Sequence, residues 1–167
     1  MKRIAVVKSN YTPFGGAEKY TTRIVNAFVE RGCKVDILTS SQLRWEGLNK
    51  DVSAVHLKQF PYNSFMKLLT FNRSVAKYLD EHNYDCVFGM DRTDRVTHLR
   101  TGGGCHAAWL DRRCKESSKV RCASFRVNPF HRLSVEIESR AFLSPSVKDI
   151  FCNSAMVRDE IKNYYPG

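Results

Sequence analysis

The sequence of 167 residues fits one domain of ordinary size, and its 27 Lys and Arg against 17 Asp and Glu give a formal net charge of +10. Hydrophobic residues at 43% and charged residues at 26% are typical of globular proteins and exclude disorder, collagen-like repeats and coiled coils. No apolar stretch approaches the ~18 residues of a membrane-spanning helix, and the apolar run after Met1 is too short for a secretory signal, so we expect a cytoplasmic protein.

Short apolar runs alternate with helical patterns in the first half of the chain. Residues 4–7 are wholly apolar and partly β-branched, which is typical of a buried parallel strand. Gly32 stands where a glycine commonly ends a helix. In chain order, the pattern predicts strands over 4–7, 35–39, 52–60 and 86–89, with helices over 17–28 and 65–79 between them.

The second half continues this alternation. We expect a short helix over 107–113 and a polar loop over 115–126, followed by a helix that begins at Pro129. A further strand over 149–152 leads into a last helix capped by Asn153 and Ser154. Strands that alternate with helices predict the fold class α/β, with a doubly wound, mostly parallel sheet.

The chain ends in the turn-forming residues 164–167, which usually lead into another element. We therefore expect residues 1–167 to be a single domain of a larger, two-domain protein.

The six cysteines have irregular spacing and form no C-x-x-C pair. Zinc ribbons and thioredoxin-like sites therefore lack their signature, and the group of Cys105, His106, Cys114 and Cys122 matches no common metal pattern. Without a secretion signal, we expect reduced thiols and no bound metal.

Basic residues gather between Arg92 and Arg132, where only Asp94, Asp111 and Glu116 offset them. Such a segment is either a solvated surface or a site that attracts phosphates, nucleic acid or an anionic membrane.

Two glycine-rich segments follow predicted strands. Gly15 and Gly16 lie at the carboxyl end of the first strand, where open α/β sheets bind ligands, and they precede a helix whose N-terminal N–H groups favour anions. The segment is neither a dinucleotide fingerprint nor a P-loop. It is therefore either a ligand-binding loop or a plain tight turn.

The second segment runs from Thr101 through Gly102, Gly103 and Gly104 to His106. Three ordered glycines cost chain entropy, so this loop either is a flexible connector or brings its backbone against a ligand. His106, at a helix start, is either a catalytic or a structural histidine. Asp91 and Arg92, after the strand over 86–89, either orient a polar ligand or belong to a solvated loop.

Four segments resemble the retaining GT-B glycosyltransferases of the fourth family, which use nucleotide-sugar donors. Residues 11–18 resemble the family's Tyr/Pro turn and Gly-Gly-Ala-Glu, and 27–39 resemble its Arg-Gly-His-x-Val segment, with Cys33 in place of the usual His. Residues 153–165 resemble the segment before the interdomain linker, and 88–110 are similar to bacterial lipopolysaccharide-core hexosyltransferases.

The resemblance implies roles for individual residues. Gly15 and Gly16 match the glycine loop that lies against the donor, and His106 matches a histidine near the reacting centre, which makes it the candidate catalytic residue. The candidate acceptor-binding residues lie in loops that face the acceptor in the family: Asp91, Arg92, Thr101, Gly102 and Gly103.

The resemblance also implies a reaction and partners. The chain would be the N-terminal, acceptor-side half of an enzyme that moves a hexose from a nucleotide-sugar such as a UDP-hexose to a lipopolysaccharide-core or other glycan or glycolipid acceptor, without a metal. The donor domain would be a C-terminal partner, and the fragment alone would be inactive. The basic region 92–132, with Trp109, Phe125 and Phe130, would dock on the cytoplasmic face of the inner membrane.

Two alternatives stay open at this point. Basic residues and Phe125 interleave over 119–127, as in a nucleic-acid-binding domain, although no nucleic-acid-binding motif accompanies them. The other alternative is a nucleotide-binding module that catalyses no transfer.

Overall fold

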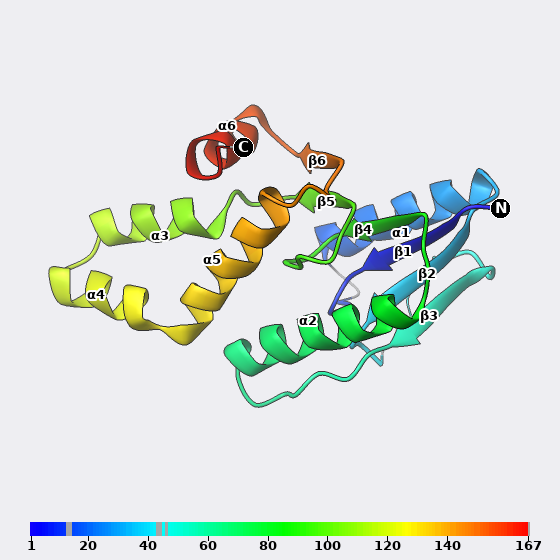
Figure 1. Ribbon diagram of the computed structural model, residues 1–167, viewed down its shortest axis with the longest axis horizontal. Coiled ribbons are helices and arrows are strands. Elements are labelled where there is room, and N and C mark those ends of the chain that lie inside the picture. The colour runs from blue at the N-terminus through cyan, green and yellow to red at the C-terminus, as the bar shows by residue number, and fades with distance from the viewer. Residues whose placement is uncertain (13–14, 43–44, 46, 167) are drawn as a thin grey trace.

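The computed structural model describes residues 1–12, 15–42, 45 and 47–166 and folds them around one six-stranded sheet (Figure 1). Pro13 and Phe14, which precede the first glycine pair, and Gly167 of the terminal turn lie outside the described residues. The strands are β1 (Arg3–Val7), β2 (Lys34–Thr39), β3 (Val52–His56), β4 (Cys86–Gly89), β5 (His98–Thr101) and β6 (Asp149–Cys152). The helices are α1 (Gly16–Glu30), α2 (Ser64–Glu81), α3 (His106–Lys115), α4 (Lys119–Val127), α5 (Pro129–Phe142) and α6 (Ala155–Tyr164).

All neighbouring strands run parallel, in the order β3-β2-β1-β4-β5-β6. The order reverses at β1, which lies between β2 and β4. In a doubly wound sheet this reversal opens a crevice at the carboxyl ends of the strands, where ligands bind. The predicted α/β class with a mostly parallel sheet is therefore confirmed.

Successive residues of the central strands pack on opposite faces of the sheet. Ile4 and Val6 of β1 join one hydrophobic cluster, which Val25 of α1 completes. Ala5 and Val7 join the other, together with Phe71 and Val75 of α2. Because side chains alternate along a strand, the apolar residues 4–7 of β1 must be covered on both faces, and α1 and α2 provide this cover.

Helix ends follow their local sequence. Asn63 and Ser154 cap α2 and α6 by accepting hydrogen bonds from the backbone N–H groups of Met66 and Val157. Pro129 occupies the first turn of α5, as predicted. Gly32, with φ at +75°, follows α1 in the left-handed conformation that glycine adopts without strain.

The predicted loop over 115–126 is wrong, because most of it forms α4. The side chain of Ser118 caps this helix at the N–H of Arg121, and no proline or glycine interrupts it. None of its residues is buried, so it lacks the apolar stripe that predicts a surface helix. Two strands differ from the prediction as well. Strand β3 ends at His56 rather than at residue 60, and β5 was not predicted.

The expectation of reduced thiols fails for one pair of cysteines. Cys114 at the end of α3 and Cys122 in α4 form a disulfide, with Cα atoms 4.8 Å apart. Cys33, Cys86, Cys105 and Cys152 are free, and Cys105 is buried. The disulfide closes the turn between α3 and α4. These two helices pack with α5, and the three lie beyond one end of the sheet (Figure 1).

None of the described helices is both long and apolar enough to cross a membrane.

Candidate functional site

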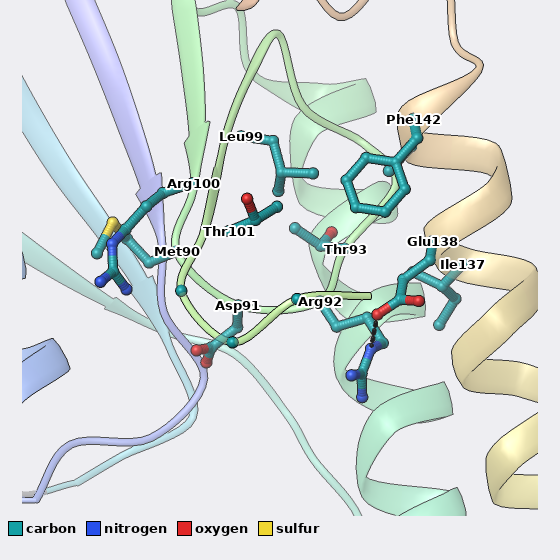
Figure 2. Close-up of a pocket in the computed structure, with 14 residues that line it drawn as sticks. Met90, Asp91, Arg92, Thr93, Leu99, Arg100, Thr101, Ile137, Glu138 and Phe142 are labelled. Atoms are coloured by element: carbon teal, nitrogen blue, oxygen red, sulfur yellow. Dashed lines mark hydrogen bonds and ion pairs between the residues drawn. The ribbon is translucent and has the colours of Figure 1, made fainter. Parts of the chain in front are cut away.

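A cavity of about 220 Å³ opens at the carboxyl ends of β4 and β5, between their loops and α5. Figure 2 shows Asp91, Arg92 and Thr93 of the β4 loop on one side and Ile137, Glu138 and Phe142 of α5 on the other. The five predicted acceptor-binding residues all line this cavity: Asp91, Arg92, Thr101, Gly102 and Gly103. Residues from loops that are ten positions apart in the sequence thus meet at one site, because β4 and β5 are parallel neighbours.

Arg92 is held by a carboxylate that the sequence did not reveal. Its Nε lies 3.0 Å from Glu138 Oε1, and its guanidinium also approaches the hydroxyl of Ser134 at 3.5 Å (Figure 2). Glu138 Oε2 accepts the backbone N–H of His106 at 2.7 Å and the hydroxyl of Tyr165 at 3.4 Å. Burial raises the pKa of the Glu138 carboxyl, while Arg92 and these hydrogen bonds oppose the shift. One carboxylate therefore joins the β4 loop, α3, α5 and the end of α6.

Asp91 connects the β4 loop to the loop after β1. Its Oδ1 lies 2.9 Å from Lys8 Nζ, and its Oδ2 accepts the backbone N–H of Ser9 at 2.8 Å and the Ser9 hydroxyl at 2.6 Å. Lys8 is 7% exposed and also lies 3.7 Å from Glu18 Oε1. The Asp91 carboxylate is thus partly exposed but not free, since three hydrogen bonds from Lys8 and Ser9 fix its orientation at the rim of the cavity.

The imidazole of His106 does not line this cavity. Its Nε2 lies 2.9 Å from Nδ1 of His131, and its ring stacks on Trp109 with centroids 5.3 Å apart. Burial, together with the nearby positive charge of Arg92 and His131, lowers the pKa of His106 to about 4. Partial burial and Arg92 also lower the pKa of His131. Near pH 7 both imidazoles are neutral, and neutral imidazoles can donate and accept hydrogen bonds.

Gly15 and Gly16 lie at the start of α1, and Gly15 is its N-cap with no side-chain hydrogen bond. A Cβ at Gly15 would collide with the carboxylate of Glu18 and would lie 2.8 Å from the hydroxyl of Thr12, so a larger residue there would require both side chains to shift. Among the described residues, no atom lies within 4 Å of a Cβ built at Gly16. With respect to those residues, the space beside Gly16 is open at a helix N-terminus, where backbone N–H groups favour anions.

Lys8, Glu18 and Glu138 are the charged residues of the site that the sequence did not indicate, and His131 is the unpredicted partner of His106. Lys8 directly follows the buried strand β1, and a polar residue at that position lies at the ligand-binding edge of a parallel sheet. Glu138 directly follows Ile137 on the buried side of α5, where Ala141 is buried as well. A charged residue on an apolar helix face is the signal that could have indicated it.

A metal site was not expected, and within the described ranges no three His, Cys, Asp or Glu side chains are grouped so as to hold a metal ion.

The fold is shared with solved glycosyltransferase structures. The structure of WaaG, a glycosyltransferase involved in lipopolysaccharide biosynthesis, matches 97% of this chain with a TM-score of 0.82 and 21% identity. Phytolacca americana UGT2 complexed with UDP-2fluoro-glucose and pterostilbene matches 99% of the chain with a TM-score of 0.58 and 11% identity. The chain spans only 41% of the WaaG chain and 51% of the UGT2 chain. Both likenesses show the Rossmann-like α/β fold of GT-B glycosyltransferases.

No curated protein matches the sequence. The model of Glycosyltransferase Family 4, however, matches residues 14–166, which is nearly the whole length. The chain belongs to glycosyltransferase family 4.

Proposed function

We propose that this chain is the N-terminal, acceptor-side domain of a retaining glycosyltransferase that moves a hexose from a nucleotide-sugar to a lipopolysaccharide-core or other glycan or glycolipid acceptor. The observation that carries the proposal is the cavity between the β4 and β5 loops and α5, which gathers Asp91, Arg92 and Thr101 in a chain of this family. Carboxylate, guanidinium and hydroxyl groups are suited to the hydroxyls of a sugar, because they donate and accept hydrogen bonds in fixed directions.

The donor would bind between this domain and a C-terminal donor-binding domain. Retaining transfer develops positive charge at the anomeric carbon and negative charge on the departing diphosphate. The open helix N-terminus at Gly16 favours the diphosphate, and basic side chains of the donor domain would complete its neutralisation without a metal.

His106 stays the candidate catalytic residue. Its neutral imidazole is the form that can share a hydrogen bond with a sugar hydroxyl, and it lies on the first turn of α3, directly after the glycine loop that lines the cavity. To reach a substrate, the ring would have to exchange its present partner, His131. Replacement by Ala in the protein that carries both domains should lower turnover. The buried ring also bonds His131, so the variant should lose stability too, and turnover is compared at a temperature where it is folded. Unchanged turnover would remove His106 from the catalytic residues.

Transfer itself is tested by joining the chain to a donor-binding domain and supplying a UDP-hexose with a core-type glycan acceptor. The proposal expects transfer by the joined protein and little by this chain alone.

The acceptor site is tested by substitution. Arg92→Ala should raise the KM for the acceptor more than it lowers kcat. Arg95→Ala is the matched control, because Arg95 is on the same loop but pairs with Asp80 outside the cavity. Equal effects of the two substitutions would contradict the assignment of the acceptor site.

We further propose that the enzyme is peripheral on the cytoplasmic face of the inner membrane. Three arginines of the predicted basic region 92–132 already form ion pairs: Arg92 with Glu138, Arg95 with Asp80, and Arg112 with Glu160. The cations of this region that are exposed and form no ion pair with a described residue lie at the end of α3, on α4 and at the start of α5: Arg113, Lys115, Lys119, Arg121, Arg126 and Arg132. Beside them, Val120 and Val127 are 82% and 73% exposed and Trp109 is 37% exposed, whereas Phe125 and Phe130 are half-buried. Free positive charge next to exposed apolar side chains suits an anionic leaflet.

Sedimentation with vesicles that contain phosphatidylglycerol tests this docking. Binding should be strong at low salt and fall as salt rises, and Lys119→Glu with Arg126→Glu should abolish it. Binding of a single-stranded oligonucleotide without binding of vesicles would favour nucleic acid as the partner instead.

A further inference from the structure

A second cavity of about 470 Å³ lies next to the candidate acceptor site, at the carboxyl ends of β1 and β4 and the start of α2. Asp91 and Arg92 line both cavities, so these two residues form the boundary between them. Polar groups in the remaining walls come from Ser9 and Asn10 after β1 and from Gln59, Ser64 and Lys67 around the start of α2, while Leu68 and Phe71 of α2 add apolar surface. Such a set of hydroxyl, amide and ammonium groups suits a ligand with many hydroxyls.

The charges around the second cavity favour a neutral ligand over an anion. Lys8 is paired with Asp91 and Glu18, and Arg92 is paired with Glu138. Lys67 adds one further cation. Three lining cations are thus matched in number by three carboxylates, of which Asp91 lines the cavity and Glu18 and Glu138 pair with Lys8 and Arg92 outside its lining. Paired charges attract a phosphate weakly while they still offer oriented hydrogen-bond donors and acceptors.

An exposed aromatic pair stands on the loop that forms one wall of this cavity. Phe60 and Tyr62 are 55% and 82% exposed, and their rings are nearly parallel, with centroids 6.4 Å apart and an interplanar angle of 16°. They lie in the sequence between Gln59 and Ser64, which line the cavity. A pyranose ring has an apolar C–H face and a polar edge, so it can lie on an exposed aromatic ring while its hydroxyls meet polar groups nearby.

The loop that carries these rings is held in place before any ligand binds. The Gln59 amide donates to the carbonyl of Lys67 at 3.2 Å and accepts from the Ser40 hydroxyl at 3.1 Å. The backbone N–H of Phe60 donates to Thr70 Oγ1 at 3.0 Å. These contacts fix the loop on α2 and on the end of β2, which lowers the entropy cost of binding.

We propose that the second cavity, with Phe60 and Tyr62, is a sugar subsite that binds the acceptor one or more residues away from the reacting sugar. This inference rests on the proposed function and adds that the acceptor is an oligosaccharide that passes over Asp91 and Arg92. The subsite recognises neutral sugar rings rather than phosphates.

The test is an NMR titration of the ¹⁵N-labelled chain with core oligosaccharide released from bacterial lipopolysaccharide by mild acid and then treated with phosphatase. A methyl hexoside serves as the single-sugar probe. The oligosaccharide should shift signals of residues at both cavities. Tyr62→Ala should weaken its binding about tenfold and leave the methyl hexoside unaffected, because only the longer ligand reaches the ring. Tyr62→Trp should keep the affinity, and Tyr62→Leu should not.

Met156→Ala is the control, since Met156 is 62% exposed on α6, away from this loop. The oligosaccharide could shift the signals of residues at the first cavity and bind Tyr62→Ala with the same affinity as the unchanged chain. That result would show that the subsite is wrong, and the proposed function would stand. Loss of binding after phosphatase treatment would also overturn the subsite, because it would show recognition of phosphate. If the oligosaccharide shifts neither cavity, the acceptor site of the proposed function fails as well.

Discussion

His106 Nε2 and His131 Nδ1 lie 2.9 Å apart, so a single hydrogen bond between two imidazoles joins α3 to α5. One ring must donate and the other accept, which requires that they are not both protonated. The pKa of His106 falls from 6.5 to about 4 in the folded protein, mainly because the ring is buried. Between these pH values the unfolded chain binds more protons than the folded chain, so acid should favour unfolding.

The first prediction is therefore a loss of stability as the pH falls below about 6.5, amounting to on the order of 2 kcal/mol near pH 4. The raised pKa of Glu138 acts with the opposite sign and offsets part of this loss. Urea unfolding between pH 7.5 and 4 measures the effect, and His106→Asn should flatten the acid slope. The control is His56→Asn at the exposed end of β3, which removes a histidine without touching the pair. An equal slope in the unchanged chain and in His106→Asn would contradict the prediction.

The second prediction concerns the carboxylate of Glu138. Replacement by Gln removes the charge that pairs with Arg92 but keeps the shape, and it leaves the partly buried guanidinium without a counter-ion. We expect a loss of about 1–2 kcal/mol, less than for a fully buried pair because the Arg92 side chain is 30% exposed. Urea unfolding of the single variants Glu138→Gln and Arg92→Gln and of the double variant measures their coupling.

The matched control for Glu138 is Glu136→Gln on the same helix. Glu136 is exposed and pairs with Arg140 one turn away, so its removal should change the free energy of unfolding by less than about 0.5 kcal/mol. If the losses in free energy of unfolding from Arg92→Gln and Glu138→Gln simply added in the double variant, the two residues would not act as a pair.

The third prediction is that the disulfide between Cys114 and Cys122 stabilises the turn from α3 to α4. Alkylation of the unfolded, non-reduced chain should modify Cys33, Cys86, Cys105 and Cys152 and spare the other two cysteines. Cys114→Ser with Cys122→Ser should lower the free energy of unfolding by about 2 kcal/mol, because the cross-link restricts a short loop of the unfolded chain. Cys152→Ser is the control, and modification of all six thiols without a reductant would contradict the pairing.

Part of the site followed from the position of a predicted strand, and part only from the family resemblance. Asp91 and Arg92 follow the strand over 86–89, at the edge of a parallel sheet where ligands bind, although a solvated loop stayed open as the alternative. Thr101 ends a strand that was not predicted, and the resemblance alone implied that these residues face an acceptor. They line one cavity. Glu138, the partner of Arg92, could not be predicted from the sequence, because it lies 46 residues away and only the packing of α5 against the β4 loop brings the two together.

Helix α4 was missed for a related reason. Its sequence is polar and basic, and periodicity predicts a helix only where one face is apolar. What holds α4 is its packing against α3 and α5, the cap at Ser118 and the disulfide. Only the cap is a local signal, and a single serine does not predict a helix. Even His106, which was placed correctly at a helix start, acquired a partner that spacing did not predict.

The last prediction separates two neighbouring glycines of the loop that lines the acceptor cavity. Gly104 has a φ of +79°, and a Cβ there would collide with the carboxylate of Glu160 on α6. At Gly103 a Cβ would meet no atom of the part of the chain that the structure describes within 4 Å. Gly104→Ala should therefore cost about 1–3 kcal/mol of folding free energy, from backbone strain and the displaced carboxylate, whereas Gly103→Ala should cost less than about 1 kcal/mol.

Thermal unfolding of the two variants measures this difference, and binding of the acceptor oligosaccharide gives the complementary result. Gly103→Ala places a methyl group at the cavity wall of a stable protein, so it should weaken binding without loss of stability. Equal melting temperatures for the two variants would show that the left-handed backbone of Gly104 and its contact with Glu160 do not hold the loop. Glu160→Ala removes the carboxylate that a Cβ at Gly104 would meet, and on its own it also breaks the ion pair with Arg112 of α3. The double variant Gly104→Ala with Glu160→Ala should therefore be more stable than the sum of the two single losses predicts.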